Sequence, residues 1–298
     1  MNGFTHHEQR NGRRQDRKSF SSFPTLEDLR DIAKHPEDYV GPTDESNWVI
    51  PGLLLVGAYP CSMDDVETWE ILRGILVLKV TTFVCLQQEY VHEGVTEQMW
   101  RSGEYLRPYF KDAVGFAPRL GLDAASLSLL HFPIEDCGTA DDDRLAALAH
   151  HLVSLLAKGE VMYLHCWGGH GRTGTVICLL LHLMYNYTAD QAFERCQYLH
   201  DLRRIPVAVG SPQTQGQREQ VRRVIEKLKR QAREKEKRRQ RQEQQQQQQA
   251  AAVAQAAAAA YASYGPEYAA AMAAYAAAGY GGYGGGAGGG GYGGYGGY

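Results

Sequence analysis

One short segment of the sequence combines residue types that could do chemistry together. Cys166 ends a predicted buried strand, three glycines fall within the next five residues, and Arg172 opens a nearly all-apolar helix. Glycine adopts positive φ readily, so consecutive backbone N–H groups in this loop can turn inward and form an anion-binding nest. The start of the following helix and the planar guanidinium of Arg172 add positive charge. This field favours the thiolate of Cys166, and the pattern therefore predicts a nucleophile at the floor of an oxyanion cradle.

The same residues carry a resemblance to a known family. His165-Cys166, five further residues, Arg172, Thr173 and Gly174 resemble the HCx5RTG active-site signature of the cysteine-dependent protein tyrosine phosphatase superfamily. Six fixed letters would coincide in a chain of this length with odds on the order of one in 10⁵. The stretch 48–60 is similar to the opening strand pair of the dual-specificity branch. The resemblance spans roughly residues 47–225.

The resemblance implies a two-step transfer of a phosphoryl group with a phosphocysteine intermediate. Cys166 would attack the phosphorus of a phosphomonoester while Arg172 holds the equatorial oxygens. The phosphate would lie in a cradle formed by Trp167, Gly168, Gly169, His170, Gly171 and Arg172. Asp136, in an Asp-x-Gly sequence similar to the acid loop of the family, would protonate the leaving oxygen. No metal ion or other cofactor is implied, because the cradle itself supplies the positive field.

Other residues of the candidate site have a functional and a structural interpretation. Thr173 would donate its hydroxyl to the leaving sulfur, although a helix cap would also explain a threonine there. Gln213 and Gln217, in a Gln-Thr-x-x-Gln sequence, resemble the loop that orients water in the second step, but a Gln-rich helix start explains the same letters. His165 is expected to support the loop backbone through a hydrogen bond.

The choice of acid stays open between neighbouring carboxylates. Glu135 and Asp141 lie close to Asp136 in the sequence. Acidic residues before a helix also serve as plain caps. Helix capping is therefore the alternative to a catalytic role for each of these three residues.

The two variable side chains of the loop bear on the substrate. Trp167 offers a neutral, bulky wall and His170 at most a partial charge, where superfamily members that act on phosphoinositides often carry lysines. This favours a protein phosphatase acting on phosphotyrosine, phosphoserine or phosphothreonine, so that the implied partner is a phosphoprotein. The alternatives are a phosphoinositide phosphatase, an RNA 5′-phosphatase, and a phosphate-binding pseudophosphatase scaffold on the same fold.

Charge is distributed very unevenly along the 298 residues. Residues 25–221 carry 15 Lys/Arg against 27 Asp/Glu, whereas residues 222–243 carry 11 against 4. An acidic body with basic flanks is not typical of a nucleic-acid-binding domain. The Ala-rich and Gly-Tyr-rich sequence after residue 249 is of low complexity and suits self-association or weak nucleic-acid contact.

The candidate site needs strands and helices to position it, and the pattern of the chain provides them. Short strands are predicted around Pro51-Gly52, over 81–86, 127–132 and 160–165, and they alternate with amphipathic helices. We therefore expect a single three-layer α/β domain with a central, mostly parallel sheet flanked by helices. The expected boundaries are a mostly disordered segment over 1–46, the domain over 47–225, a basic, Gln-rich helical extension over 226–249 and a disordered tail over 250–298.

The cell compartment is predicted from what the chain lacks. The six cysteines form no CxxC pair, which speaks against zinc and against a disulfide framework. The N-terminus lacks the apolar stretch of a secretory signal, and no apolar run is long enough to span a membrane. We expect an intracellular protein, in the cytoplasm or the nucleus.

Overall fold

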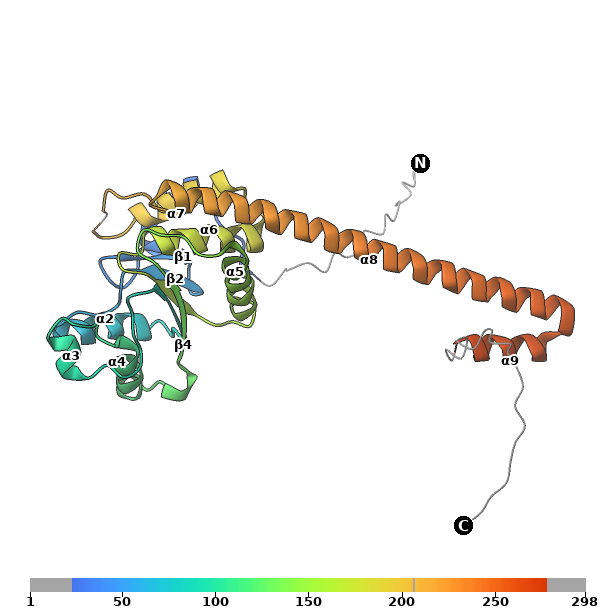
Figure 1. Ribbon diagram of the computed structural model, residues 1–298, viewed down its shortest axis with the longest axis horizontal. Coiled ribbons are helices and arrows are strands. Elements are labelled where there is room, and N and C mark those ends of the chain that lie inside the picture. The colour runs from blue at the N-terminus through green and yellow to red at the C-terminus, as the bar shows by residue number, and fades with distance from the viewer. Residues whose placement is uncertain (1–22, 206, 278–298) are drawn as a thin grey trace, which may run out of the picture. The chain divides into compact units, whose positions relative to one another are not determined.

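The computed structural model describes residues 23–205 and 207–277 (Figure 1). The chain divides into two compact units, Met1–Leu228 and Lys229–Tyr298, and each is described by itself. The apolar core lies in the first unit, where its last members are Val221, Val224, Ile225 and Leu228.

A five-stranded sheet forms the centre of the first unit, in the order β1-β2-β5-β3-β4. β1 and β2 pair antiparallel, and the other described pairs are parallel. The prediction of an α/β domain with a mostly parallel sheet is confirmed. The strands are β1 (Ser46–Ile50), β2 (Leu54–Gly57), β3 (Thr82–Gln87), β4 (Ser128–Ile134) and β5 (Met162–His165).

Helices cover both faces of this sheet, with α2, α3 and α4 on one side and α5, α6 and α7 on the other (Figure 1). The helices of the first unit are α1 (Leu29–Ile32), α2 (Asp65–Leu76), α3 (Glu97–Arg101), α4 (Tyr109–Phe116), α5 (Asp142–Leu156), α6 (Gly171–Tyr185) and α7 (Ala189–Asp201), with 3-10 turns at Pro36–Tyr39, Ala117–Leu120 and Ala124–Ser126.

The helix that follows the candidate loop is the most buried one. α6 is apolar around nearly its whole circumference, and it packs between α5 and α7 against the sheet. A helix of this kind is stable only inside a core. It therefore fixes the position of the loop that precedes it.

The segment before residue 47 has more structure than its polar composition suggested. Residues 1–22 lie outside the described residues, but α1 is capped by the side chain of Asp28, and Ile32 and Tyr39 belong to the core. Arg195 of α7 donates a hydrogen bond to the backbone carbonyl of Glu27 (2.7 Å). The segment is held in place because Ile32 and Tyr39 pack into the core and because Arg195 binds the backbone carbonyl of Glu27.

The expected helical extension is longer than 226–249. α8 runs from Gln215 to Tyr264, and α9 from Pro266 to Ala277. The sequence after residue 249 was expected to be disordered, but alanine has the highest intrinsic helix propensity, and the helix continues through the Ala-rich stretch. Residues 278–298 of that expected tail lie outside the described residues.

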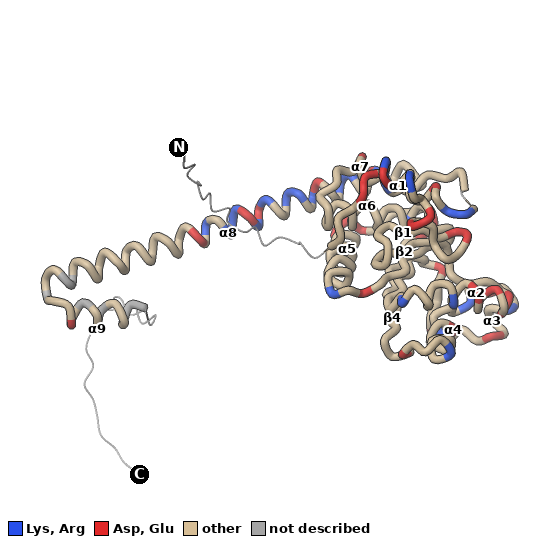
Figure 2. The backbone as a smooth tube through the Cα atoms, turned by 180° about the vertical axis from the view of Figure 1, so that it is seen from behind, with Lys and Arg blue, Asp and Glu red and all other residues tan. Residues whose placement is uncertain are grey.

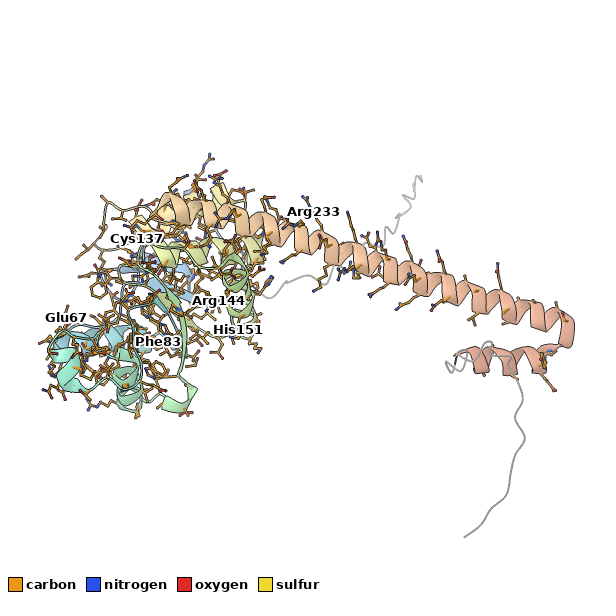
Figure 3. All side chains as sticks on the ribbon, viewed as in Figure 1. Glu67, Phe83, Cys137, Arg144, His151 and Arg233 are labelled. Carbon is orange, nitrogen blue, oxygen red and sulfur yellow. The ribbon has the colours of Figure 1, made fainter. Side chains whose placement is uncertain are left out.

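Between Leu228 and Glu243, α8 carries mainly basic residues with a few acidic residues among them, and the helix beyond Glu243 is uncharged (Figure 2). Its side chains, such as that of Arg233, point outward and are exposed (Figure 3). Arg239 pairs with Glu236 and Glu243 along the helix. In the described part of the chain, no helix combines the length and the apolar character needed to cross a membrane.

Candidate active site

The candidate loop lies where the central strand β5 ends and α6 begins. Residues 166–170 connect His165, the last residue of β5, to Gly171, the first of α6. Ligands of parallel α/β sheets bind at this carboxyl end of the strands. A cavity of about 180 Å³ opens there, lined by Asp136, Cys137, Cys166, Trp167, Gly168, His170, Gly171, Arg172, Gln213 and Gln217.

The course of the loop depends on Gly169. Its φ is +70°, and a Cβ on this residue would lie 2.3 Å from the backbone oxygen of Gly57 at the end of β2. No other residue fits this approach of two backbones. Of the three loop glycines, Gly169 alone has a positive φ, and packing against the neighbouring strand explains its place in the pattern.

A buried arginine that the sequence analysis missed holds the back of the loop. Arg203, just after α7, donates to the carbonyl oxygens of Gly168 and Gly169, at 3.0 Å each, and to Oδ1 of Asn47 at 2.8 Å. In a trans peptide the N–H points opposite to the C=O. The amide groups that follow these carbonyls, those of Gly169 and His170, therefore point away from Arg203. Only the fold brings Arg203 here, because no local spacing connects it to the loop.

The two signature residues lie together at this cavity. The Cys166 side chain is buried, with 3% of the residue exposed, and so is Arg172. Burial opposes the charge of Arg172, but the hydrogen bonds to Glu89, together with the charges of Cys166, Glu89 and Asp136, outweigh this effect and raise its pKa. The guanidinium donates to both carboxylate oxygens of Glu89, at 2.9 and 3.0 Å.

Glu89 is a second residue that the sequence analysis missed. It follows β3 directly, and it orients the guanidinium from the side with the two-pronged geometry typical of arginine and carboxylate. Burial alone would raise the pKa of Glu89, but the hydrogen bonds from Arg172, its backbone and Gln87, together with the charge of Arg172, lower it overall. An acidic residue just after a buried strand was a signal that the sequence contained, but without the fold nothing linked it to Arg172.

Among the rival carboxylates, the structure brings Asp136 to the arginine. Its Oδ1 lies 2.9 Å from Nη2 of Arg172, and its side chain is 71% exposed. Glu135 is exposed and makes no ion pair with any described residue. Asp141 caps α5 by accepting hydrogen bonds from the backbone of Asp143 and Arg144. The geometry thus assigns capping to Asp141 and a place beside the cavity to Asp136.

The two glutamines also reach the cavity, but in different ways. Gln217 is buried, accepts from the backbone N–H groups of Gln213 and Thr214 through Oε1, and donates to the carbonyl of Gly138. It therefore ties the acid loop to the start of α8. Gln213 is exposed, and its side chain makes no hydrogen bond to a described residue.

His165 and Thr173 differ in their hydrogen bonds. His165 is completely buried between the carbonyl of Cys166 (3.2 Å from Nδ1) and the hydroxyl of Tyr109 (2.7 Å from Nε2). Thr173 Oγ1 is buried and has no partner among the described residues. A buried hydroxyl without a partner carries an energetic cost.

Trp167 and His170 occupy the variable positions of the loop. Trp167 is 56% exposed and stacks on Tyr59, with ring centroids 5.8 Å apart. His170 is half-buried, and its Nδ1 lies 2.7 Å from Nε2 of His200 on α7. The tryptophan thus forms a neutral wall of the cavity.

Comparison with known proteins agrees with these features. The family described as "PTP-SAK: Swiss Army Knife protein, DSP-PTPase phosphatase domain" matches residues 43–253. The chain belongs to this family and, with it, to the cysteine-dependent protein tyrosine phosphatase superfamily, on the dual-specificity-like side.

Individual relatives match shorter segments. A putative tyrosine phosphatase, 067L of Invertebrate iridescent virus 3, is 33% identical over 78 residues, which are 25% of this chain and 32% of the viral protein. Cyclin-dependent kinase inhibitor 3 of Mus musculus is 34% identical over 64 residues, 22% of this chain and 30% of the mouse protein. The chain thus covers about a third of the length of these curated relatives.

Solved structures similar to the chain include two phosphatases. A mutant form of Tk-PTP has a TM-score of 0.42 at 18% identity, and the match covers 62% of this chain and 97% of that one. Kinase associated phosphatase has a TM-score of 0.41 at 23% identity, with 59% and 86% covered.

Proposed function

We propose that this protein hydrolyses phosphomonoesters of phosphotyrosine, phosphoserine or phosphothreonine in proteins through a phosphocysteine intermediate. The observation that carries this proposal is the placement of Cys166 and Arg172 on one small cavity, in a loop whose carbonyls are turned away by Arg203. Inward-facing amides and one guanidinium stabilise charge on the equatorial oxygens of a transferring phosphoryl group.

In the first step, the Cys166 thiolate forms an S–P bond while the P–O bond to the leaving group breaks. Asp136 gives its proton to the departing oxygen. Asp136 gives up its contact with Arg172 for this transfer, because the phosphate oxygens bind the guanidinium instead. Glu89 keeps the guanidinium oriented during this exchange.

In the second step, water attacks phosphorus and the P–S bond breaks. Asp136 accepts a proton from the water, and inorganic phosphate leaves. Gln213, whose amide is free of protein partners among the described residues, orients the water in this proposal, and Gln217 positions the acid loop. The partnerless hydroxyl of Thr173 donates to the departing sulfur.

The substrate class follows from the lining of the cavity. Arg172 is the one Lys or Arg among its described lining residues, and Trp167 closes one side with an apolar ring. One permanent cation matches one phosphate rather than a headgroup with several phosphates. The viral relative is named a putative tyrosine phosphatase, which agrees with a phosphoprotein substrate.

Turnover of a substrate panel by the full chain tests this proposal. The panel contains p-nitrophenyl phosphate, phosphotyrosyl and phosphoseryl peptides, a phosphoinositide and a 5′-phosphorylated RNA. We expect the phosphopeptides to have the highest kcat/KM, and the Cys166→Ser variant to be inactive on all five. Cys137→Ser is the matched control, because this exposed cysteine lines the same cavity and should be dispensable.

Three outcomes would contradict the proposal. Activity that survives in Cys166→Ser would exclude the phosphocysteine intermediate. A kcat/KM far higher for the phosphoinositide or the RNA than for the phosphopeptides would show that the proposed substrate class is wrong. It would leave the proposed chemistry unchanged. Absence of turnover with all five, together with tight phosphate binding, would identify a pseudophosphatase.

A further inference from the structure

A chain of hydrogen bonds leads from the surface of α7 to the phosphate loop. Oδ1 of Asp201 lies 3.2 Å from Nδ1 of His200, and Nε2 of His200 lies 2.7 Å from Nδ1 of His170. Gln197 donates to the same oxygen of Asp201 (2.8 Å) and holds the carboxylate in place. The histidine pair is not part of the phosphatase signature, and the proposed chemistry does not use it.

Asp201, at the outer end of this series of hydrogen bonds, determines the tautomers of the His200 and His170 rings. A carboxylate only accepts hydrogen bonds, so Nδ1 of His200 carries the proton. In a neutral ring Nε2 of His200 is then an acceptor, and Nδ1 of His170 must be the donor. The remaining nitrogen of His170, Nε2, is therefore left with a free lone pair.

This nitrogen lies beside the phosphate loop. A Cβ on Gly168 would lie 2.4 Å from Nε2 of His170, so the ring packs over that glycine. No described residue forms a hydrogen bond with Nε2, and His170 lines the cavity with Cys166 and Arg172. An anion in the cavity would thus meet a ring nitrogen that has no protein partner.

The charges around His170 keep it neutral while the cavity is without an anion. Burial, then Arg203 and His200, lower the pKa of His170 to about 4. Burial and Arg203 also lower the pKa of His200, against the effect of Asp201. On the loop itself the charged neighbours are Arg172 and, when ionised, Cys166. A dianion in the cavity would offset the positive charges of Arg203 and Arg172 and favour a proton on His170.

We propose that Asp201, His200 and His170 form a hydrogen-bonded relay that stabilises a second positive charge at the cavity when a phosphate dianion binds. A proton from solvent forms an N–H bond at Nε2 of His170, and this N–H donates to a phosphate oxygen. The resulting imidazolium is stabilised through His200 by the carboxylate of Asp201. His170 acts here as a binding residue, and His200 and Asp201 as positioning residues. The inference rests on the proposed phosphate site but not on turnover.

Binding of sulfate to the full-length Cys166→Ser/Asp136→Asn variant tests the relay. Sulfate remains a dianion between pH 5 and pH 7, and the two substitutions remove the other titrating groups expected to act in catalysis. Uptake of up to one proton should weaken sulfate binding by up to about tenfold for each unit that the pH rises. Titration calorimetry in two buffers with different ionisation enthalpies measures the proton uptake directly.

Substitutions in this background identify the group that takes up the proton. His170→Gln should bind sulfate without the proton uptake, and Asp201→Asn should reduce it. Asp190→Asn is the matched control, because Asp190 is an exposed carboxylate on the same helix that pairs with Arg222 instead. Uptake that persists in His170→Gln would assign the proton to another group, such as Glu89, and would overturn the relay.

Nitrogen NMR of the histidine rings is a second test that needs no change in affinity. Both His170 and His200 should show the Nδ1–H tautomer, with assignments from the His170→Gln and His200→Gln spectra. An Nε2–H tautomer at His200 would contradict the relay. Sulfate binding without proton uptake would overturn the relay but leave the proposed phosphatase function intact, whereas an active Cys166→Ser protein would overturn the function alone.

Discussion

His165, the residue before Cys166, is a buried imidazole whose two ring nitrogens both form hydrogen bonds. Because the carbonyl of Cys166 can only accept, Nδ1 of His165 carries the proton, and Nε2 accepts from the hydroxyl of Tyr109. A second proton on this ring would break the hydrogen bond from Tyr109. Complete burial lowers the pKa of His165 to about 3.

This histidine makes the stability of the fold depend on pH. The unfolded chain binds a proton at His165 below its usual pKa of about 6.5, and the folded protein does not bind it until about pH 3. The stabilisation is therefore complete above pH 6.5 and is lost as the pH falls from there toward 3. Between pH 7 and pH 5 we expect His165 to account for a loss of about 2 kcal/mol in the free energy of unfolding.

Urea denaturation of the wild type and His165→Gln at the two pH values measures this contribution. The variant should be less stable at pH 7 and should lose less stability on acidification. His151→Gln, an exposed histidine on α5, is the control and should follow the wild type. Parallel pH profiles for wild type and His165→Gln would refute the assignment.

Asp136 and its neighbour Glu135 offer a second test at this scale. If Asp136 is the general acid, Asp136→Asn should lower kcat by about 10²–10⁴-fold on a phosphoseryl peptide. The loss should be smaller on p-nitrophenyl phosphate, because nitrophenolate leaves without full protonation. Glu135→Gln should remain close to wild type. Steady-state kinetics measures both variants. An equal loss of kcat in Asp136→Asn and Glu135→Gln would leave the general acid unassigned.

At the scale of elements, the site is a turn between β5 and α6 that is held from three sides. β2 approaches it at Gly57, Arg203 binds its carbonyls from behind, and Gln217 of α8 packs against Gly171. The loop is therefore rigid before any ligand arrives. A prepared site of this kind needs little rearrangement to stabilise developing charge.

The contact between β2 and the loop predicts a strong effect of one methyl group. Gly169→Ala would place a Cβ at positive φ, which alone costs about 1–2 kcal/mol, and it would also clash with the oxygen of Gly57. We expect a lower melting temperature and a lower kcat/KM. The control is Gly115→Ala in α4, where the new Cβ meets nothing within 4 Å and should stabilise the helix by roughly 0.5–1 kcal/mol. Equal melting temperatures for the two variants would disprove the contact.

At the scale of the whole molecule, the first unit contains all the parts of the site. Its core includes the beginning of α8 through four buried side chains, Val221, Val224, Ile225 and Leu228. The described residues of α8 that follow Leu228 are mostly exposed. The domain should therefore not depend on the second unit for its stability.

Two truncations test this expectation. A chain that ends at Leu228 should keep the melting temperature and the kcat/KM of the full chain to within measurement error. A chain that ends at Thr214 would lose four buried apolar side chains, worth about 1.5–3 kcal/mol each. The sum is comparable to the whole stability of a typical domain, so this chain should not fold. Calorimetry that shows the 1–228 chain to be unfolded would place the second unit within the folding unit.

Sequence reasoning predicted those features that local patterns determine. The Cys166–Arg172 spacing and the alternation of strands and helices predicted the superfamily and the α/β fold, and the family match and the sheet confirm both. The order of letters suffices there because a strand, a glycine turn and a helix N-terminus are neighbours along the chain. The predicted roles of Asp136 and the two glutamines remain to be tested.

Tertiary structure alone decided which distant residues serve the loop. Glu89 and Arg203 lie far from Cys166 in the sequence, yet one orients Arg172 and the other turns the loop carbonyls away. The sequence around Glu89 or Arg203 contains no pattern that indicates a partner so far along the chain. Such pairs form because a buried charge or carbonyl requires a hydrogen bond, and only the packing of the strands and helices determines which residue is close enough to provide it.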